Sequence, residues 1–367
     1  MKTIHLFTWL LFFCLYTHAQ ELTIIKENKG TAVKNQGQSG TCWNYSTTSL
    51  IESESIRKDL LRNPDLSEMF TVRNVYIEKA KNYLLRQGKA QFSEGGLGHD
   101  LIHAIELYGA MPQIAFKSVN GEIPNHEGLD KQLKSYLDNV LTQRPIAANW
   151  LDGYTKILDE KIGVAPAEFV YEGKKYTPLS FAKDVLHFNA NDYISLTSFT
   201  HHPFYQQFVL EAPDNFANGL FYNVPLSDLL QITEKAIDNG YTIMWDADVS
   251  NQGFQQKKGY ALFFEHPEDA KQEKLNPDAP EAPYTQDARQ ALYENLTTQD
   301  DHLMHIVGLE KSKENKLFFK VKNSWGEVGP FKGYIAVSQA YFAINTVSIV
   351  LPKAALSEEL KNKLQVE

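Results

Sequence analysis

The first two thirds of the chain carry apolar residues at the spacing of helices. Such residues recur from Trp43 to Ile51, from Leu129 to Leu137 and over residues 227–232. Side chains three and four positions apart share one face of a helix, so each stretch predicts an amphipathic helix. The first of these helices is expected to begin near residue 42, directly after a glycine-rich loop.

The last third of the chain alternates apolar and polar residues in the manner of strands. Residues 301–308 have the pattern of a half-buried strand, and residues 317–326 predict a second strand that ends in a turn. An apolar segment at 342–352 predicts a further strand, and the polar residues 356–367 predict a short surface helix. The chain thus places helices before an antiparallel sheet.

Composition narrows the class of protein. The 367 residues are 43% hydrophobic and 22% charged, the balance of an ordinary soluble globular protein. The net charge is -9 and the isoelectric point is near 5.7, which argues against the basic surface that nucleic-acid binding needs. No nucleic-acid partner is therefore expected.

The N-terminus has the features of an export signal. Lys2 precedes an apolar run over residues 4–16, and Ala19 supplies the small residue of a cleavage site. The run is too short to span a bilayer, and the residues before Cys14 lack the small side chain of a lipoprotein box. We expect residues 1–19 to be a signal peptide and the mature protein, residues 20–367, to be exported (periplasmic or secreted) without a stable membrane anchor.

Cys42 is the residue that most directly suggests chemistry. It is the only cysteine of the mature protein, because Cys14 leaves with the signal peptide. At the first turn of a helix, unpaired N–H groups and the helix dipole favour a thiolate. Gln36, on the preceding glycine-rich loop, can fold back and offer its amide to an oxyanion. Taken alone, a cysteine is as easily a small buried apolar residue, so partners have to be found.

A nucleophilic thiol needs a base and a group that orients the base. His302 lies on the first predicted strand and Asn323 at the end of the second, so neighbouring strands would bring both to Cys42. His305 is the alternative base, but it lies three residues further along the strand and leaves the opposite face. Trp325 is placed to shield the contact between imidazole and amide from water, although a core tryptophan is equally normal.

Three sequence boxes resemble those of the papain superfamily of cysteine peptidases. They are Gln-Gly-x-x-Gly-x-Cys-Trp at 36–43, Asp-His followed by a strand that ends at Gly308, and Lys-Asn-Ser-Trp-Gly at 322–326. In that family the catalytic histidine precedes the strand glycine by six positions, which selects His302. More than 250 residues separate Cys42 from His302, a spacing similar to that of the bleomycin hydrolase and aminopeptidase C branch.

The resemblance implies an α+β fold of two lobes with a cleft between them, and Cys42 would head the central helix of the first lobe. The boundaries follow the change from helical to alternating patterns: 36–128 for the helical lobe, 129–235 for a helical insertion that shapes the cleft, 236–355 for the antiparallel β lobe and 356–367 for a C-terminal tail.

Four further residues are expected to contact the substrate. Gly95 and Gly96 lie in a loop edge where a substrate backbone can pair, because glycine permits close approach. Without the resemblance, an ordinary flexible loop would be the preferred interpretation of these glycines. Trp43 and Trp325 lie next to the predicted active-site residues in sequence, and they too are expected to contact the substrate.

The same resemblance implies a cysteine peptidase with a Cys42-His302-Asn323 triad, Gln36 in the oxyanion hole and a covalent acyl-enzyme. In the resting enzyme the Cys42 thiolate would be paired with protonated His302. The partner would be a peptide or protein substrate, and no metal or other cofactor is expected. Members of the branch are known as hexamers, so a homo-oligomer is an open alternative.

The C-terminal end bears on the type of peptidase. In the bleomycin hydrolase branch a C-terminal arm enters the cleft and supplies a carboxylate for the amine of the substrate, which makes the enzyme an aminopeptidase. Here residues 342–352 resemble the strand before the arm and residues 356–367 the helix after it, while the arm itself is missing. We therefore expect an open cleft and an endopeptidase, with aminopeptidase action as the alternative.

Two other classes of function compete with the peptidase. A papain-like scaffold that has lost turnover and serves as a binding protein would normally show a substituted nucleophile or base, and neither is missing here. An amidase or transglutaminase-like enzyme shares cysteine and histidine, but it usually pairs them with aspartate and lacks the Asn-Ser-Trp-Gly box at 323–326.

Overall fold

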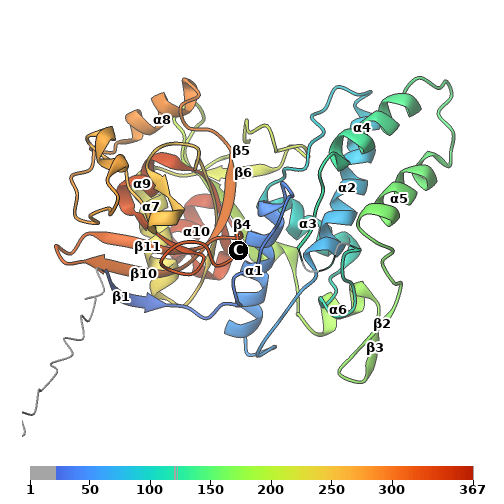
Figure 1. Ribbon diagram of the computed structural model, residues 1–367, viewed down its shortest axis with the longest axis horizontal. Coiled ribbons are helices and arrows are strands. Elements are labelled where there is room, and N and C mark those ends of the chain that lie inside the picture. The colour runs from blue at the N-terminus through green and yellow to red at the C-terminus, as the bar shows by residue number, and fades with distance from the viewer. Residues whose placement is uncertain (1–21, 120, 122, 367) are drawn as a thin grey trace, which may run out of the picture.

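The computed structural model describes residues 22–119, 121 and 123–366, so the predicted signal peptide lies outside the described residues. Figure 1 shows α1 (Cys42–Arg57) in the middle of the molecule, with helices on one side and a large sheet on the other. Among the described residues, no helix is both long and apolar enough to cross a membrane.

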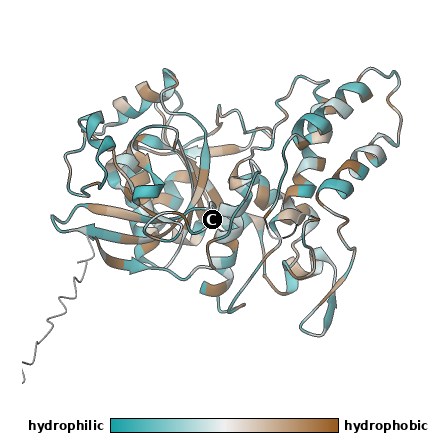
Figure 2. Cartoon of the chain, in the orientation of Figure 1, coloured by the Kyte–Doolittle hydropathy of each residue, from teal (hydrophilic) through white to brown (hydrophobic). Residues whose placement is uncertain are grey.

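The helical lobe consists of helices that bury one face against a shared apolar core. The helix predicted at residues 129–137 is α4, which buries Leu129, Leu133 and Leu137 at helical spacing. Hydrophilic and hydrophobic residues are mixed along α4 and α5 (Trp150–Lys161) in Figure 2, as expected for helices that cover a core from outside. The remaining elements of this lobe are α2 (Glu68–Leu85), α3 (Gly98–Tyr108), α4 (Leu129–Val140), α5 (Trp150–Lys161), α6 (Pro178–Asp184) and the hairpin β2 (Phe169–Tyr171) and β3 (Lys174–Tyr176).

The β lobe is a single large sheet with the strand order β5-β6-β4-β13-β7-β10-β11-β12-β9-β8, and β1 pairs with β10 beside this path. Most neighbours are antiparallel, whereas β4 with β6 and β9 with β12 are parallel. The strands are β1 (Leu22–Glu27), β4 (Tyr193–Thr197), β5 (Gln207–Val209), β6 (Leu220–Asn223), β7 (Ile243–Ala247), β8 (Phe254–Gln255), β9 (Tyr260–Ala261), β10 (His302–Ser312), β11 (Leu317–Lys322), β12 (Tyr334–Ser338) and β13 (Thr346–Pro352).

Helices cover both faces of the central strands, so β7 and β13 are buried at every residue. On β10 the side chains alternate: Leu303 joins the core shared with the helical lobe, while Met304 and Ile306 join the core on the other face. That second core includes residues of α7 (Leu226–Asp238) and α9 (Gln339–Asn345), and α8 (Gln286–Glu294) lies near α9. The arrangement presses β10 against α1, which begins at Cys42.

Two expectations about element boundaries differ from the structure. The segment 129–235 is not one helical insertion: its helices α4 to α6 pack in the helical lobe, whereas β4 pairs with β13 and carries β5 and β6 into the large sheet. The predicted strand at 342–352 begins only at Thr346, because Ser338 caps a short helix by accepting a hydrogen bond from the Tyr341 N–H.

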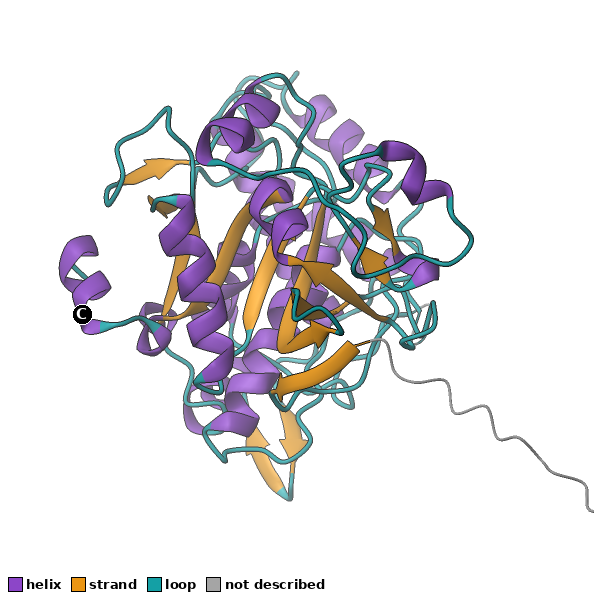
Figure 3. Ribbon diagram, turned by 90° about the vertical axis from the view of Figure 1, so that its left-hand side faces the viewer, coloured by secondary structure: helices purple, strands orange, loops and turns teal. Residues whose placement is uncertain are grey.

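The predicted C-terminal helix is α10 (Glu358–Leu364). It buries Leu360 and Leu364 against the core that α7 covers, and its polar residues face outward. Figure 3 shows this end of the chain at the outer edge of the molecule.

Candidate active site

Cys42 is the first residue of α1 and lies where the helix meets β10. Its side chain is buried, and its sulfur accepts a hydrogen bond from the backbone N–H of Leu303, the residue that follows His302. The helix start leaves N–H groups of the first turn without helical partners. The structure therefore brings the predicted nucleophile next to the strand residue that follows the predicted base.

His302 and Asn323 meet as the sequence predicts, at the start of β10 and just beyond the end of β11. The Nε2 atom of His302 lies 2.7 Å from Asn323 Oδ1, in a buried contact. The Ser324 N–H donates to the same oxygen, so Oδ1 is fixed as an acceptor and His302 carries a proton on Nε2. In the neutral ring Nδ1 is then the basic nitrogen.

Trp325 stacks on the His302 ring with 4.6 Å between ring centroids and 28° between planes. An aromatic face in this position excludes water from the contact between His302 and Asn323, which strengthens that hydrogen bond. The predicted shielding role of Trp325 thus has a geometric basis, while its predicted contact with substrate stays a prediction.

Gln36 is held beside the same residues. Its backbone N–H donates to the Ser324 carbonyl at 2.8 Å, and its side-chain Oε1 accepts from Ser324 Oγ at 2.6 Å. Its Nε2 atom donates to the Ser39 carbonyl at 2.7 Å, which uses one of two amide hydrogens. The hydrogen bonds of the described residues leave the second amide hydrogen unused, and the predicted oxyanion role of Gln36 stays a prediction.

Gln256 is a contributor that the sequence analysis missed. It lies in a short 3₁₀ turn between β8 and β9, where its Oε1 accepts from Asn323 Nδ2 at 3.0 Å. Its own Nε2 donates to the backbone carbonyls of Val328 and Tyr334. Gln256 thereby fixes which way the Asn323 amide points. It belongs to no sequence box, and only its contact with Asn323 identifies it.

Burial opposes charge on both reacting groups. It raises the pKa of the Cys42 thiol to about 12, and the carboxylates of Asp246, Asp300 and Asp214 add to this effect. Burial also lowers the pKa of His302 to about 4, although the contact with Asn323 acts in the opposite direction. The predicted resting pair of thiolate and imidazolium therefore depends on attraction between the two charges and on the positive end of α1.

His305 lies on the other face of β10, as strand parity predicts. Its Nδ1 atom is 2.8 Å from Ser49 Oγ of α1, and the ring is fully buried. Burial lowers its pKa well below the usual value, and the nearby Lys322 adds to the shift. His305 packs β10 against α1, and its Nδ1 bonds to Ser49 rather than to a residue of the predicted triad.

The residues that are predicted to contact a substrate differ in how deeply they are buried. Trp43 is 1% exposed and donates from Nε1 to the Glu94 carbonyl, so its ring supports the Gly95–Gly96 loop from behind. Its predicted contact with a substrate stays a prediction. A side chain at Gly96 would press on the Trp43 ring, whereas one at Gly95 would collide with the Asp214 carboxylate. The glycine contacts with substrate stay predictions.

One group of side chains in the described part of the chain could hold a metal ion: His201, His202 and Glu211, with donor atoms within 4.8 Å of one another. The Thr200 N–H donates to Gln290 Oε1, so Gln290 turns its Nε2 donor to His201 Nδ1 at 2.9 Å. The ring proton of His201 must then sit on Nε2, which faces Glu211 at 3.1 Å. A protonated nitrogen cannot bind a metal, so the cluster fits hydrogen bonds and ion pairs better.

Comparison with known proteins gives the family of this chain. The sequence profile of the peptidase C1-like family matches residues 167–367, which is more than half of the chain. Aminopeptidase G from Lactobacillus delbrueckii subsp. lactis is 25% identical over 380 residues, which cover 90% of this chain and 83% of the relative. Bleomycin hydrolase from Homo sapiens is 22% identical over 393 residues, which cover 92% of this chain and 84% of the relative.

A solved structure shows the same fold. PepW from Lactobacillus rhamnosis HN001 (DR20) superposes with a TM-score of 0.76 at 20% sequence identity, covering 94% of this chain and 84% of that chain. The predicted α+β papain-like fold and the predicted resemblance to the bleomycin hydrolase and aminopeptidase C branch are both confirmed. The chain belongs to the peptidase C1-like family and is a cysteine peptidase.

Proposed function

We propose that this cysteine peptidase cleaves peptide bonds with Cys42 as nucleophile, His302 as base and acid, and Asn323 as the residue that orients the imidazole. The observation that carries the proposal is the 2.7 Å contact between His302 Nε2 and Asn323 Oδ1. His302 directly precedes Leu303 on β10. Leu303 donates its N–H to the Cys42 sulfur. The ring is thereby oriented at Nε2, and Nδ1 is left to exchange a proton with the thiol.

In the first half of the reaction, the Cys42 sulfur attacks the carbonyl carbon of the scissile bond while His302 holds the thiol proton. The second N–H of the Gln36 amide and the backbone N–H of Cys42 stabilise the oxyanion. His302 then gives its proton to the leaving amine as the C–N bond breaks. The products of this half are the free amine and a thioester on Cys42.

In the second half, His302 takes a proton from water while the water oxygen attacks the thioester carbon. The same two donors stabilise the second oxyanion. The C–S bond breaks, the sulfur recovers its proton from His302, and the carboxylic acid product leaves. Asn323 keeps the ring in one orientation through both halves, and it neither gains nor loses a proton.

The test combines labelling with turnover. An epoxide that alkylates papain-like thiols should modify Cys42 alone, as peptide mapping would show, and should abolish hydrolysis of unblocked peptides. A Cys42→Ser variant should be neither labelled nor active. His103, an exposed histidine on α3, provides the control variant His103→Ala, which should keep full activity.

Two outcomes would contradict the proposal. Full hydrolysis by Cys42→Ser would refute the nucleophile. A reactive Cys42 in a protein that hydrolyses no peptide would instead favour a binding protein on the same scaffold.

We also propose that the protein is exported after cleavage near Ala19 and Gln20. The support is the pattern of Lys2, the apolar run at 4–16 and the small residue at the cleavage site. Mass spectrometry of the protein from each cell fraction would test this, and an uncleaved protein in the cytosol would contradict it. From the family resemblance we also propose a homo-oligomer, and sedimentation of the purified protein would measure its oligomeric state.

Whether the enzyme acts as an endopeptidase or as an aminopeptidase depends on the residues that border Cys42 and the Gly95–Gly96 loop. The open cleft and endopeptidase action predicted from the sequence require a free edge at Gly95. In the structure the Asp214 carboxylate lies against that glycine. This contact favours a cleft that is closed at one end, and hence the alternative of aminopeptidase action.

A further inference from the structure

The loop that leads into α1 is held in place by contacts with other segments, and we call its residues 36–41 the nucleophile loop. At its first residue, Gln36, the backbone N–H donates to the Ser324 carbonyl of the β lobe at 2.8 Å. Two residues on, Gln38 exchanges hydrogen bonds of 3.1 and 2.9 Å with the segment 124–126, which precedes α4. Both contacts use backbone groups, so changes of side chain leave them in place.

A third contact of the nucleophile loop is made by a side chain. The Gly40 N–H, two residues before Cys42, donates to Oε2 of Glu94. The two segments run close together here, because a Cβ atom at Gly40 would lie 2.9 Å from the Cβ atom of Glu94. Glycine at this position lets the carboxylate reach the backbone. A substitution at Glu94 can therefore remove the contact without changing the sequence of the nucleophile loop.

Glu94 also holds the first turn of α1 through its backbone. The Nε1 atom of Trp43, the residue after Cys42, donates to the Glu94 carbonyl at 3.1 Å. Glu94 thus contacts the chain on both sides of the thiol, at Gly40 through its side chain and at Trp43 through its carbonyl. The position of Cys42 relative to Glu94 is fixed by these two contacts.

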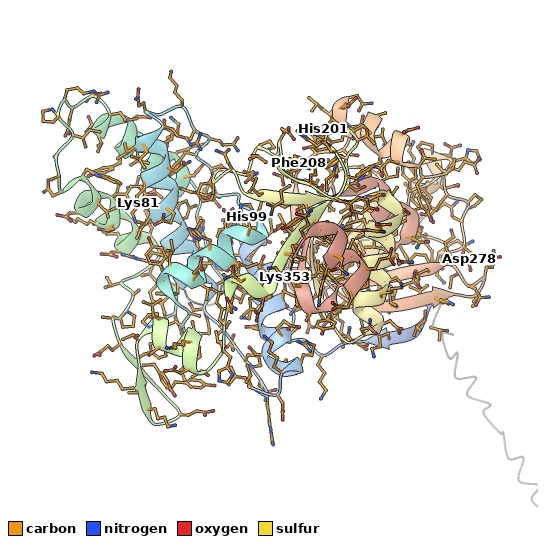
Figure 4. All side chains as sticks on the ribbon, turned by 180° about the vertical axis from the view of Figure 1, so that it is seen from behind. Lys81, His99, His201, Phe208, Asp278 and Lys353 are labelled. Carbon is orange, nitrogen blue, oxygen red and sulfur yellow. The ribbon has the colours of Figure 1, made fainter. Side chains whose placement is uncertain are left out.

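Glu94 is at the same time the residue before the Gly95–Gly96 loop, the predicted edge for a substrate backbone. The helical lobe holds this edge, because Lys79 of α2 donates from Nζ to the Gly95 carbonyl. Beyond the edge the chain enters α3, and Figure 4 shows His99 of that helix between the two lobes. Glu94 therefore joins the nucleophile loop to the predicted substrate edge.

The charge of the Glu94 carboxyl is set by several neighbours. The titratable groups around it are Lys79 and Tyr76 of α2, Asp130 at the start of α4, and Asp214 beside Gly95. Burial raises the pKa of Glu94 above its ordinary value, and Asp130 adds to the shift. The Gly40 N–H and Lys79 act in the opposite direction. The carboxyl therefore loses its proton at a higher pH than an ordinary glutamate does.

We propose that Glu94 is a positioning residue for peptide cleavage, whose carboxylate sets the Cys42 sulfur at the distance from the Gly95–Gly96 edge that attack on a bound substrate requires. The inference rests on the proposed cleavage by Cys42. The ionised carboxyl suits the role because a hydrogen bond to a charged acceptor is about twice as strong as one between neutral groups. Glu94 exchanges no proton with the substrate and acts through Gly40 and Trp43.

This role separates two reactions of the thiol. Attack on a peptide needs the sulfur and the substrate edge in register, and a misplacement of about 1 Å can cost about 100-fold in rate. Alkylation by iodoacetamide needs only a thiolate that the reagent can reach. Loss of the contact at Gly40 should therefore slow peptide cleavage and spare alkylation, whereas a general loss of structure would change both.

The first test measures both reactions at neutral pH, with an unblocked fluorogenic peptide as substrate. Glu94→Ala should lower kcat/KM about 30-fold, because the acceptor is lost and the sulfur moves. Its Cys42 should still be alkylated within about threefold of the normal rate. Glu94→Gln places an amide oxygen at Gly40 and should restore kcat/KM to within about threefold of the unmodified protein. Glu127→Ala, at an exposed glutamate shortly before α4, is the matched control and should change neither reaction.

The second test follows kcat/KM between about pH 4 and pH 8. The ratio of the unmodified protein to Glu94→Gln largely cancels the titration of Cys42 and His302, because both proteins contain these residues. As pH falls through the raised pKa of Glu94, the carboxyl is protonated and becomes a weaker acceptor, so the ratio should fall about threefold, toward one. The ratio of the unmodified protein to Glu127→Gln should stay constant.

The outcomes separate this inference from the proposed function. Full activity of Glu94→Ala would overturn the inference, and so would a ratio to Glu94→Gln that does not change with pH. Equal losses of cleavage and alkylation in Glu94→Ala, without recovery in Glu94→Gln, would show a merely structural residue. If Glu94→Ala does not fold, the pH test on Glu94→Gln decides alone. An unmodified protein that is neither labelled at Cys42 nor active would refute the thiol chemistry itself, and the inference with it.

Discussion

Two neighbouring regions of the cleft satisfy their polar groups in opposite ways. Around Asn323 the groups are neutral and paired: the amide contacts His302, Gln256 and the Ser324 N–H, all within 3.0 Å. Asp214, Asp300 and Asp246 instead form an acidic row: the Asp214 N–H donates to Asp300, the carboxyl groups of Asp300 and Asp246 share a hydrogen bond, and burial raises the pKa of Asp300 and Asp246. The paired region fixes geometry, whereas the acidic row gathers buried groups of like charge.

The difference has an energetic meaning. A buried network with every group satisfied orients its members without a net charge to neutralise. A row of carboxyl groups with few cations costs stability in the free protein, and it is tolerated where binding requires it. Changes in the paired region should therefore damage turnover, while changes in the acidic row can increase stability.

The largest expected effect follows from removing the base. His302→Ala should lower kcat by at least about 10⁴-fold, because the thiol loses its proton acceptor and the leaving amine loses its donor. Peptide hydrolysis under saturating substrate measures this, with His103→Ala as the control. A loss of less than tenfold would show that another residue, such as His305, supplies the base.

The pH dependence of Cys42 alkylation tests the charge state of the resting site. Burial and the acidic row raise the pKa of Cys42, so a thiol without His302 should form thiolate only at alkaline pH. We expect fast alkylation by iodoacetamide from about pH 5 upward in the unmodified protein, and a loss of about 100-fold at pH 7 in His302→Ala. A purely alkaline rise in both proteins would show that the resting pair is neutral.

Removing the side-chain oxyanion donor should cost less than removing the base. Gln36→Ala should lower kcat about 100-fold with little change in KM, because the donor acts on charge that develops in the transition state. Gln38→Ala, two residues away on the same loop, is the matched control, since Gln38 bonds to Pro124 and His126 through its backbone. A change confined to KM would argue against this role for Gln36.

Gln256 provides a sharper test of the paired region. Gln256→Ala should lower kcat about tenfold by letting the Asn323 amide turn, while KM and the thermal unfolding midpoint stay close to those of the unmodified protein. The neighbouring Gln255→Ala is the control, because the Gln255 side chain donates to the nearby Gln252 carbonyl and the backbone is unchanged by the substitution. Equal losses in kcat and thermal stability would indicate a merely structural residue.

The smallest effect is expected on stability. The pKa of Asp300 is raised in the folded protein, so its ionisation destabilises the fold as pH rises above the unfolded value and through about 7. Asp300→Asn should therefore increase the free energy of unfolding at pH 8 by about 1 kcal/mol, and the gain should shrink toward pH 5. Chemical denaturation at both pH values measures this. A loss of stability at pH 8 would show that Asp300 forms a net favourable contact.

Sequence reasoning succeeded where chemistry follows local spacing. The parity of β10 separates His302 from His305, and the structure places them against Asn323 and Ser49 respectively. It failed where neighbours from distant segments decide the outcome. Residues 342–345 are apolar enough for a strand, but the cap at Ser338 and packing against Trp245 and Phe319 make them helical.

The sequence by itself determined the α+β class, the family resemblance and the pairing of His302 with Asn323, because these depend on short boxes and on the periodicity of single elements. Only the tertiary structure decided what borders those residues. Gln256 reaches Asn323, and Asp214 reaches Gly95, from segments with no recognisable pattern of their own. Such contacts arise when sheet order and loop path bring remote residues together, and neither is encoded in local spacing.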